Sequence, residues 1–207
     1  ILFILGGSYR PRGRGSSCKG DNCSPSAVVI VSIVGGIIAL LFITVGVSIW
    51  IAKRRGRPSS PNDTFIQTKT SLNENSEKGK IDVFTSGGWK GKYYQYGRWH
   101  GPHQFCLFFD SQRMTVQGSG SDDVGGFTID GVYSTETGRM GLTKTYKAGT
   151  GDIKENLGHK VTIQLTWNSK TNEFEGTWYV QTSKYNGRGA YKLQVDKSHI
   201  LTVCDTV

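Results

Sequence analysis

The sequence predicts an all-β fold, an antiparallel up-and-down barrel of about eight strands or alternatively a curled β-sandwich, preceded by one transmembrane α-helix and a disordered linker. Three observations predict it. Residues 27–52 carry no charge, residues 53–86 are rich in polar and charged residues, and from residue 87 onward short strand-like runs alternate with turn formers. The expected segments are a short extracellular segment (1–24, truncated if the chain is a fragment), a transmembrane helix (25–52), a basic juxtamembrane disordered linker (53–86), a β-barrel (87–196) and a C-terminal tail (197–207).

The apolar run AVVIVSIVGGIIALLFITVGVSIWIA, residues 27–52, has the length of a membrane span. As a helix it would be roughly 39 Å long, against a hydrocarbon core of about 30 Å. The alternatives are a buried core helix and a signal-peptide segment. Both are usually shorter, and a signal segment ends in a small-residue cleavage site rather than in KRRGR.

The residues after this run set the expected orientation. Those expected at the membrane interface are Trp50, Lys53, Arg54, Arg55 and Arg57. This cluster of cations favours a cytoplasmic C-terminus for a single-pass protein, and it would attract the anionic lipids of the inner leaflet. Small residues four apart in the run, Ser32 with Gly36 and Gly35 with Ala39, suggest a homodimer through this helix.

The cysteines agree with this orientation. Cys18 and Cys23 lie close together on the side that would be oxidising, where they are candidates for a disulfide. Cys106 and Cys204 have no partner at a telling spacing, as expected in a reducing compartment.

The segment from residue 87 onward predicts the barrel. Period-2 alternation places Phe127, Ile129, Gly131 and Tyr133 on one face of a strand. Short turns join the runs, so the strands must be antiparallel, and a meander without covering helices closes on itself. The expected strands are 89–96, 105–110, 113–118, 127–133, 139–147, 160–167, 172–182 and 189–195.

Two motifs carry a family resemblance. GGWKGKY in the first strand resembles the Gly-x-Trp opening of the calycin barrels, the lipocalin and avidin group, and EGTWYVQT resembles an avidin-type strand. The resemblance covers residues 87–195 and implies a barrel whose floor is closed by Trp89. It does not supply a full set of avidin ligand contacts. An immunoglobulin-like sandwich is the other alternative, but its Cys…Trp…Cys spacing is absent.

Few residues indicate a catalytic, metal or nucleotide site. His100 and His103 could share a metal but have no third ligand at a telling spacing, and Asp122 with Asp123 lacks the alternating oxygens of a calcium loop. The glycine-rich stretches do not lie between a strand and a helix, as nucleotide sites require. We therefore expect no catalytic residues, no cofactor and no metal.

The expected function is that of a binding or scaffold module. The candidate surface is the barrel mouth with Trp99, His100, His103, Asp122 and Tyr185. The alternatives are a small-ligand carrier or enzyme that uses the barrel interior, and an extracellular ligand-capturing barrel if the topology is reversed.

The net charge and the C-terminal residues bear on two further classes of partner. The net charge of +9 is shared between the membrane edge and the barrel, so nucleic acid is not the expected partner. The terminal sequence CDTV, with Asp205 and Val207, resembles a PDZ-domain ligand.

Overall fold

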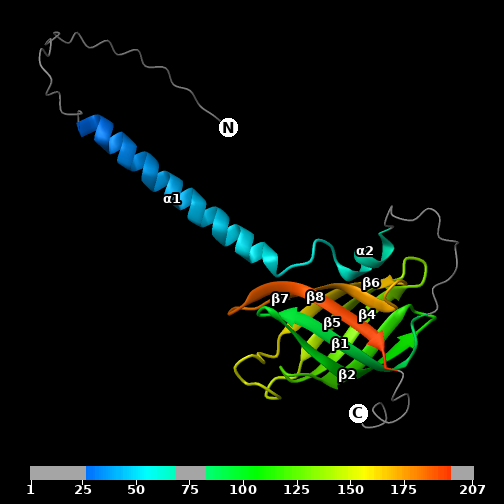
Figure 1. The fold of residues 1–207 in the computed structure, drawn as a ribbon. Coiled ribbons are helices and arrows are strands. Elements are labelled where there is room, and N and C mark those ends of the chain that lie inside the picture. The colour runs from blue at the N-terminus through cyan, green and yellow to red at the C-terminus, as the bar shows by residue number, and fades with distance from the viewer. Residues whose placement is uncertain (1–26, 69–82, 197–207) are drawn as a thin grey trace, which may run out of the picture. The chain divides into compact units, whose positions relative to one another are not determined.

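The computed structural model describes residues 27–68 and 83–196 (Figure 1). The chain divides into two compact units between Val47 and Ser48. The described elements are α1 (Ala27–Arg55), α2 (Asn62–Gln67), β1 (Gly87–Gln95), β2 (Arg98–Asp110), β3 (Thr115–Ser121), β4 (Gly126–Ser134), β5 (Arg139–Tyr146), β6 (Lys160–Asn168), β7 (Glu173–Gln181) and β8 (Asn186–Val195).

The strands form a closed barrel in which each one pairs with its neighbour in the sequence. All pairs are antiparallel, and β1 also pairs with β8, from Trp89 opposite Val195 to Tyr93 opposite Tyr191. The predicted eight-stranded antiparallel barrel is therefore confirmed. The curled sandwich is wrong, because the first and last strands hydrogen-bond to each other.

Inward-facing apolar side chains fill the barrel. Trp89 lies at the end where β1 begins, and its indole Nε1 donates to the carbonyl of Thr85 at 3.0 Å. Its ring centroid lies 5.8 Å from that of Phe109 and 6.0 Å from that of Phe174. These rings pack against one another at this end of the barrel.

The first hairpin is tighter than the sequence suggested. Tyr96 and Gly97 both have positive φ, 50° and 78°, as the central residues of a primed two-residue turn do. As a result β2 begins at Arg98 rather than at residue 105. His100 and His103, expected in a loop, lie on this strand and pair with Tyr93 and Gly91 of β1.

The segment before the barrel contradicts the expected disordered linker, because part of it is a helix docked on the barrel wall. Ile66 of α2 is buried. Thr137 Oγ1 donates to the Ile66 carbonyl at 2.6 Å, and Arg139 donates to the Phe65 carbonyl at 3.0 Å. Gly141 permits the close approach, since a Cβ there would lie 2.6 Å from Asn62. Specific contacts thus order a segment of low intrinsic periodicity.

The transmembrane helix in the predicted fold class is not upheld. The backbone of α1 is helical from Ala27 to Arg55, but its side chains are described continuously only over 36–51. No helix among the described residues combines the length and the apolarity that a membrane crossing requires.

The expected interface residues are described only in part. Arg54 places its guanidinium carbon 4.1 Å from the centre of the Trp50 ring, and Arg57 Nε donates to the Gln181 side chain on β7. The side chains of Lys53 and Arg55 lie outside the described ones. So do the proposed disulfide of Cys18 with Cys23 and the PDZ-type tail with Asp205 and Val207.

One cysteine corrects the sequence-based expectation. Cys106 is disulfide-bonded, although its spacing gave no sign of a partner. It is the one cysteine among the described residues.

Candidate ligand-binding site

Four connections gather at the end of the barrel where β1 finishes. Because the strands alternate in direction, residues 96–97, 122–125, 147–159 and 182–185 all lie at this end. The opposite end carries the three short connections 111–114, 135–138 and 169–172. We call the first end, which carries the long β5–β6 connection, the mouth.

A cavity of about 160 Å³ lies at the mouth. Its aromatic lining consists of Tyr93, Tyr96, Tyr146, Trp178, Tyr185 and Tyr191. Val161, Ile163 and Val180 add aliphatic surface, and Lys144 and His159 add polar groups. A cavity of about 150 Å³ holds a benzene ring, so this space suits a single ring or a molecule of similar size.

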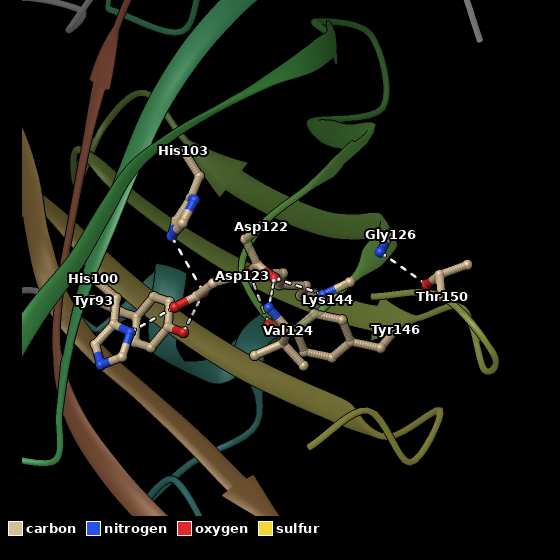
Figure 2. A network of polar contacts seen from close by, with 11 residues as sticks. Tyr93, His100, His103, Asp122, Asp123, Val124, Gly126, Lys144, Tyr146 and Thr150 are labelled. Carbon is tan, nitrogen blue, oxygen red and sulfur yellow. Dashed lines mark hydrogen bonds and ion pairs between the residues drawn. The ribbon is translucent and has the colours of Figure 1, made fainter. Parts of the chain in front are cut away.

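Asp122, in the β3–β4 turn, is the centre of a buried polar network (Figure 2). Its Oδ1 accepts the backbone N–H groups of Val124 and Gly125 at 3.0 and 3.2 Å. Its Oδ2 accepts the Tyr146 hydroxyl at 2.9 Å and pairs with the Lys144 ammonium. The Asp122 side chain is only 1% exposed, so these four donors replace its hydration.

Lys144 is held on three sides. Its Nζ lies 3.9 Å from the centre of the Phe127 ring and 4.7 Å from that of Tyr146, in addition to its contact with Asp122. Burial lowers the pKa of Lys144, and the carboxylate of Asp122 opposes this shift. The opposite charge and the two ring faces together stabilise an ammonium that is almost wholly removed from water.

Burial also fixes the protonation of the cavity tyrosines. It raises the pKa of Tyr146 and of Tyr191, and the negative charge of Asp122 raises both further. Burial, followed by the positive charge of Lys144, lowers the pKa of His159. At neutral pH the two hydroxyls therefore keep their protons and act as hydrogen-bond donors.

The next residue, Asp123, points to the other side of the same turn (Figure 2). Its Oδ1 accepts the Tyr93 hydroxyl at 2.6 Å, and its Oδ2 lies 2.6 Å from His100 Nδ1. The rings of Tyr93 and His100 stack with centroids 4.7 Å apart. Burial alone would raise the pKa of Asp123, but hydrogen bonds from Tyr93 and His100 outweigh it and the pKa is lowered.

The second histidine completes this cluster. His103 Nε2 lies 3.4 Å from Asp123 Oδ1, which is within ion-pair range but without hydrogen-bond geometry. Because an ionised Asp123 can only accept, His100 must donate through Nδ1, and its buried Nε2 has no hydrogen-bond partner among the described residues. The described part of the chain contains no group of three or more His, Cys, Asp or Glu placed to hold a metal ion.

The residues singled out from the sequence fall into three places. His100 and His103 come together with Asp123 rather than with Asp122. Tyr185 lines the cavity, with its ring 6.2 Å from that of Tyr96. Trp99 lies on the outer wall, 43% exposed and packed against Tyr94.

Sequence reasoning missed the residues inside the mouth. Lys144, Tyr146, Trp178 and Tyr191 line the cavity and were not predicted. The signal for Lys144 was available, because it shares the inward face of β5 with Met140, Leu142 and Tyr146, where a lone cation stands out.

The comparisons with protein-family models, with curated proteins and with solved structures found no match for this chain. The closed eight-stranded barrel is consistent with the calycin resemblance that the motifs GGWKGKY and EGTWYVQT carry, and no family model confirms that family.

Proposed function

We propose that the barrel is a binding module that holds one small, ring-sized ligand in the cavity at its mouth. The observation that carries this proposal is the aromatic lining of the 160 Å³ cavity. Small-molecule sites are concave and mostly apolar, with a few fixed polar groups, and this cavity has that character. The polar groups here are the tyrosine hydroxyls, Lys144 and His159.

The expected affinity follows from the area that a ring would bury. An aromatic ring buries about 150–250 Å², which at about 25 cal/mol per Å² is worth roughly 4–6 kcal/mol. This corresponds to dissociation constants between about 1 mM and 50 μM before any polar contact is made. Simple rings are therefore suitable probes at millimolar concentration.

The disulfide of Cys106 bears on the compartment. Structural disulfides persist in oxidising compartments and are rare in the cytosol. This favours ligand capture outside the cytosol over the cytoplasmic scaffold that the charge distribution suggested.

A cavity-filling variant of the full chain tests the proposal. Val161→Phe places a ring in the cavity, whereas Ala190→Phe places the same ring on the exposed outer face of β8. Binding of toluene, benzamide and benzoate would be followed by the shifts of backbone amide signals in NMR spectra.

The expected result is saturable shifts at mouth residues for the unaltered chain and for Ala190→Phe, and their loss in Val161→Phe with the rest of the spectrum preserved. If none of the probes produces saturable shifts at the mouth, the proposed function is wrong. Equal binding by Val161→Phe would place the ligand outside this cavity and would also refute it.

A further inference from the structure

The charges around the mouth cavity are not balanced. Three lysines line it, Lys144, Lys154 and Lys184, against one carboxylate, Glu155. Asp122 compensates the charge of Lys144, and the Asp122 side chain is almost fully buried and is not part of the lining. A ligand entering the mouth therefore meets an excess of positive charge at the rim.

The cavity also offers more hydrogen-bond donors than acceptors. The Tyr191 hydroxyl makes no hydrogen bond to any described residue. It fits beside the backbone of β1 because residue 91 is glycine; a Cβ there would lie 2.5 Å from the Tyr191 oxygen. The protonated hydroxyl is thus a fixed donor that has no acceptor among the described residues.

His159 and Lys144 add donors. The Leu157 N–H points to His159 Nδ1 at 3.4 Å, so a neutral His159 carries its proton on Nε2. Lys144 has three N–H donors, and Asp122 is its one hydrogen-bond acceptor among the described residues. The carboxylate of Asp122, which pairs with Lys144, already accepts hydrogen bonds from four donors. It therefore has no free acceptor position for a donor of the ligand.

We infer that the ligand of the mouth is a small aromatic acid, with its ring among the aromatic side chains and its carboxylate facing the donors. This inference rests on the proposed function and specifies the chemistry of its ligand. A ring-lined cavity could also attract an organic cation through the ring faces. Here the Lys144 ammonium already occupies the faces of Phe127 and Tyr146, and the rim lysines repel a second cation.

Three probes of nearly equal shape test the inference on the full chain: benzoate, which is an anion, benzamide, which is neutral, and benzylamine, which is a cation at neutral pH. We expect benzoate to bind about tenfold more tightly than benzamide, because hydrogen bonds to a charged group are about twice as strong as neutral ones. Benzylamine should bind more weakly than either, and added salt should weaken benzoate alone.

A matched pair of variants locates the effect. Tyr191→Phe removes the donor without disturbing a hydrogen bond to any described residue, and we expect it to lower benzoate affinity about tenfold and benzamide affinity less. Tyr179→Phe removes a hydroxyl from the outer-facing side of β7 and should leave both affinities unchanged.

The outcomes separate this inference from the proposed function. If benzoate and benzamide bind equally at the mouth, or benzylamine binds best, the ligand is not an acid, while the cavity remains a ring-binding site. If Tyr191→Phe binds benzoate as tightly as Tyr179→Phe does, the assigned donor is wrong. If no probe binds at the mouth, the proposed function fails and the inference fails with it.

Discussion

Replacing Lys144 by methionine should leave the Asp122 carboxylate buried without its counter-ion. Methionine keeps the apolar stem of lysine, so the packing against Phe127 and Tyr146 is largely retained. What disappears is the ammonium that pairs with Asp122, in a place where the two side chains are only 5% and 1% exposed.

The magnitude follows from this burial. Removing one partner of a buried ion pair typically costs about 3–5 kcal/mol, because the other charge stays in a medium of low polarity. Three of the four donors to Asp122 remain, namely the Tyr146 hydroxyl and the N–H groups of Val124 and Gly125. These donors place the expected loss at the lower end, about 3 kcal/mol, which is roughly 12–15 °C in Tm for a domain of this size.

Urea denaturation of the full chain, monitored by far-UV circular dichroism, measures this loss. The control is Lys192→Met on the barrel wall, where the ammonium lies 2.5 Å from Glu173 and 2.7 Å from Glu175. The hydrogen bond from Lys192 holds the pKa of Glu175 at about 2. The Lys192–Glu175 pair is nevertheless open to solvent, so removing the ammonium should cost less than about 1 kcal/mol. If Lys144→Met were no more destabilising than Lys192→Met, the buried pair would not support the mouth as described.

Three other predictions concern different parts of the barrel. Because the folded-state pKa of Asp123 is lowered, its contribution to the free energy of unfolding is present above its unfolded pKa and is lost as the pH falls through the folded pKa. Asp123→Asn should therefore lower stability at pH 7 by less than about 1 kcal/mol. The same variant should flatten the decline in Tm below about pH 4. Cys106→Ser should lower the free energy of unfolding by about 2–4 kcal/mol, and a reducing agent should lower the Tm of the unaltered chain but not of this variant. Arg139→Ala removes the donor to Phe65 and should speed proteolysis before the barrel while the barrel signals in NMR spectra persist; unchanged cleavage would show that this contact does not hold α2.

Much of the barrel was predictable because its sequence alternates. In β4, Phe127 and Ile129 turn inward and Thr128 and Asp130 do not, and this period placed the strand within one residue of its observed bounds. The start of β2 was not predictable in the same way. The sequence of residues 98–104 predicts a loop. These residues form a strand because β1 pairs with them after the two-residue turn.

The site was less accessible to sequence reasoning. The histidines were found, but the choice between Asp122 and Asp123 depends on which way each side chain leaves a turn, and no local pattern encodes that direction. The docked helix α2 was missed for a related reason, because its order comes from contacts with Thr137 and Arg139, more than 70 residues away in the chain. The predicted transmembrane helix is not upheld, because no helix among the described residues combines the length and the apolarity of a membrane span.

Closure of the sheet also decides how another protein can be recognised. Peptides often bind by adding a strand to an exposed sheet edge, where main-chain groups supply the affinity. In this barrel the pairing of β1 with β8 uses the main-chain groups that an open edge would present. A protein partner must therefore be selected by side chains of the outer wall and of the turns. Insertions in the connections at the mouth can then alter recognition while the strand pairing, and with it the fold, stays the same.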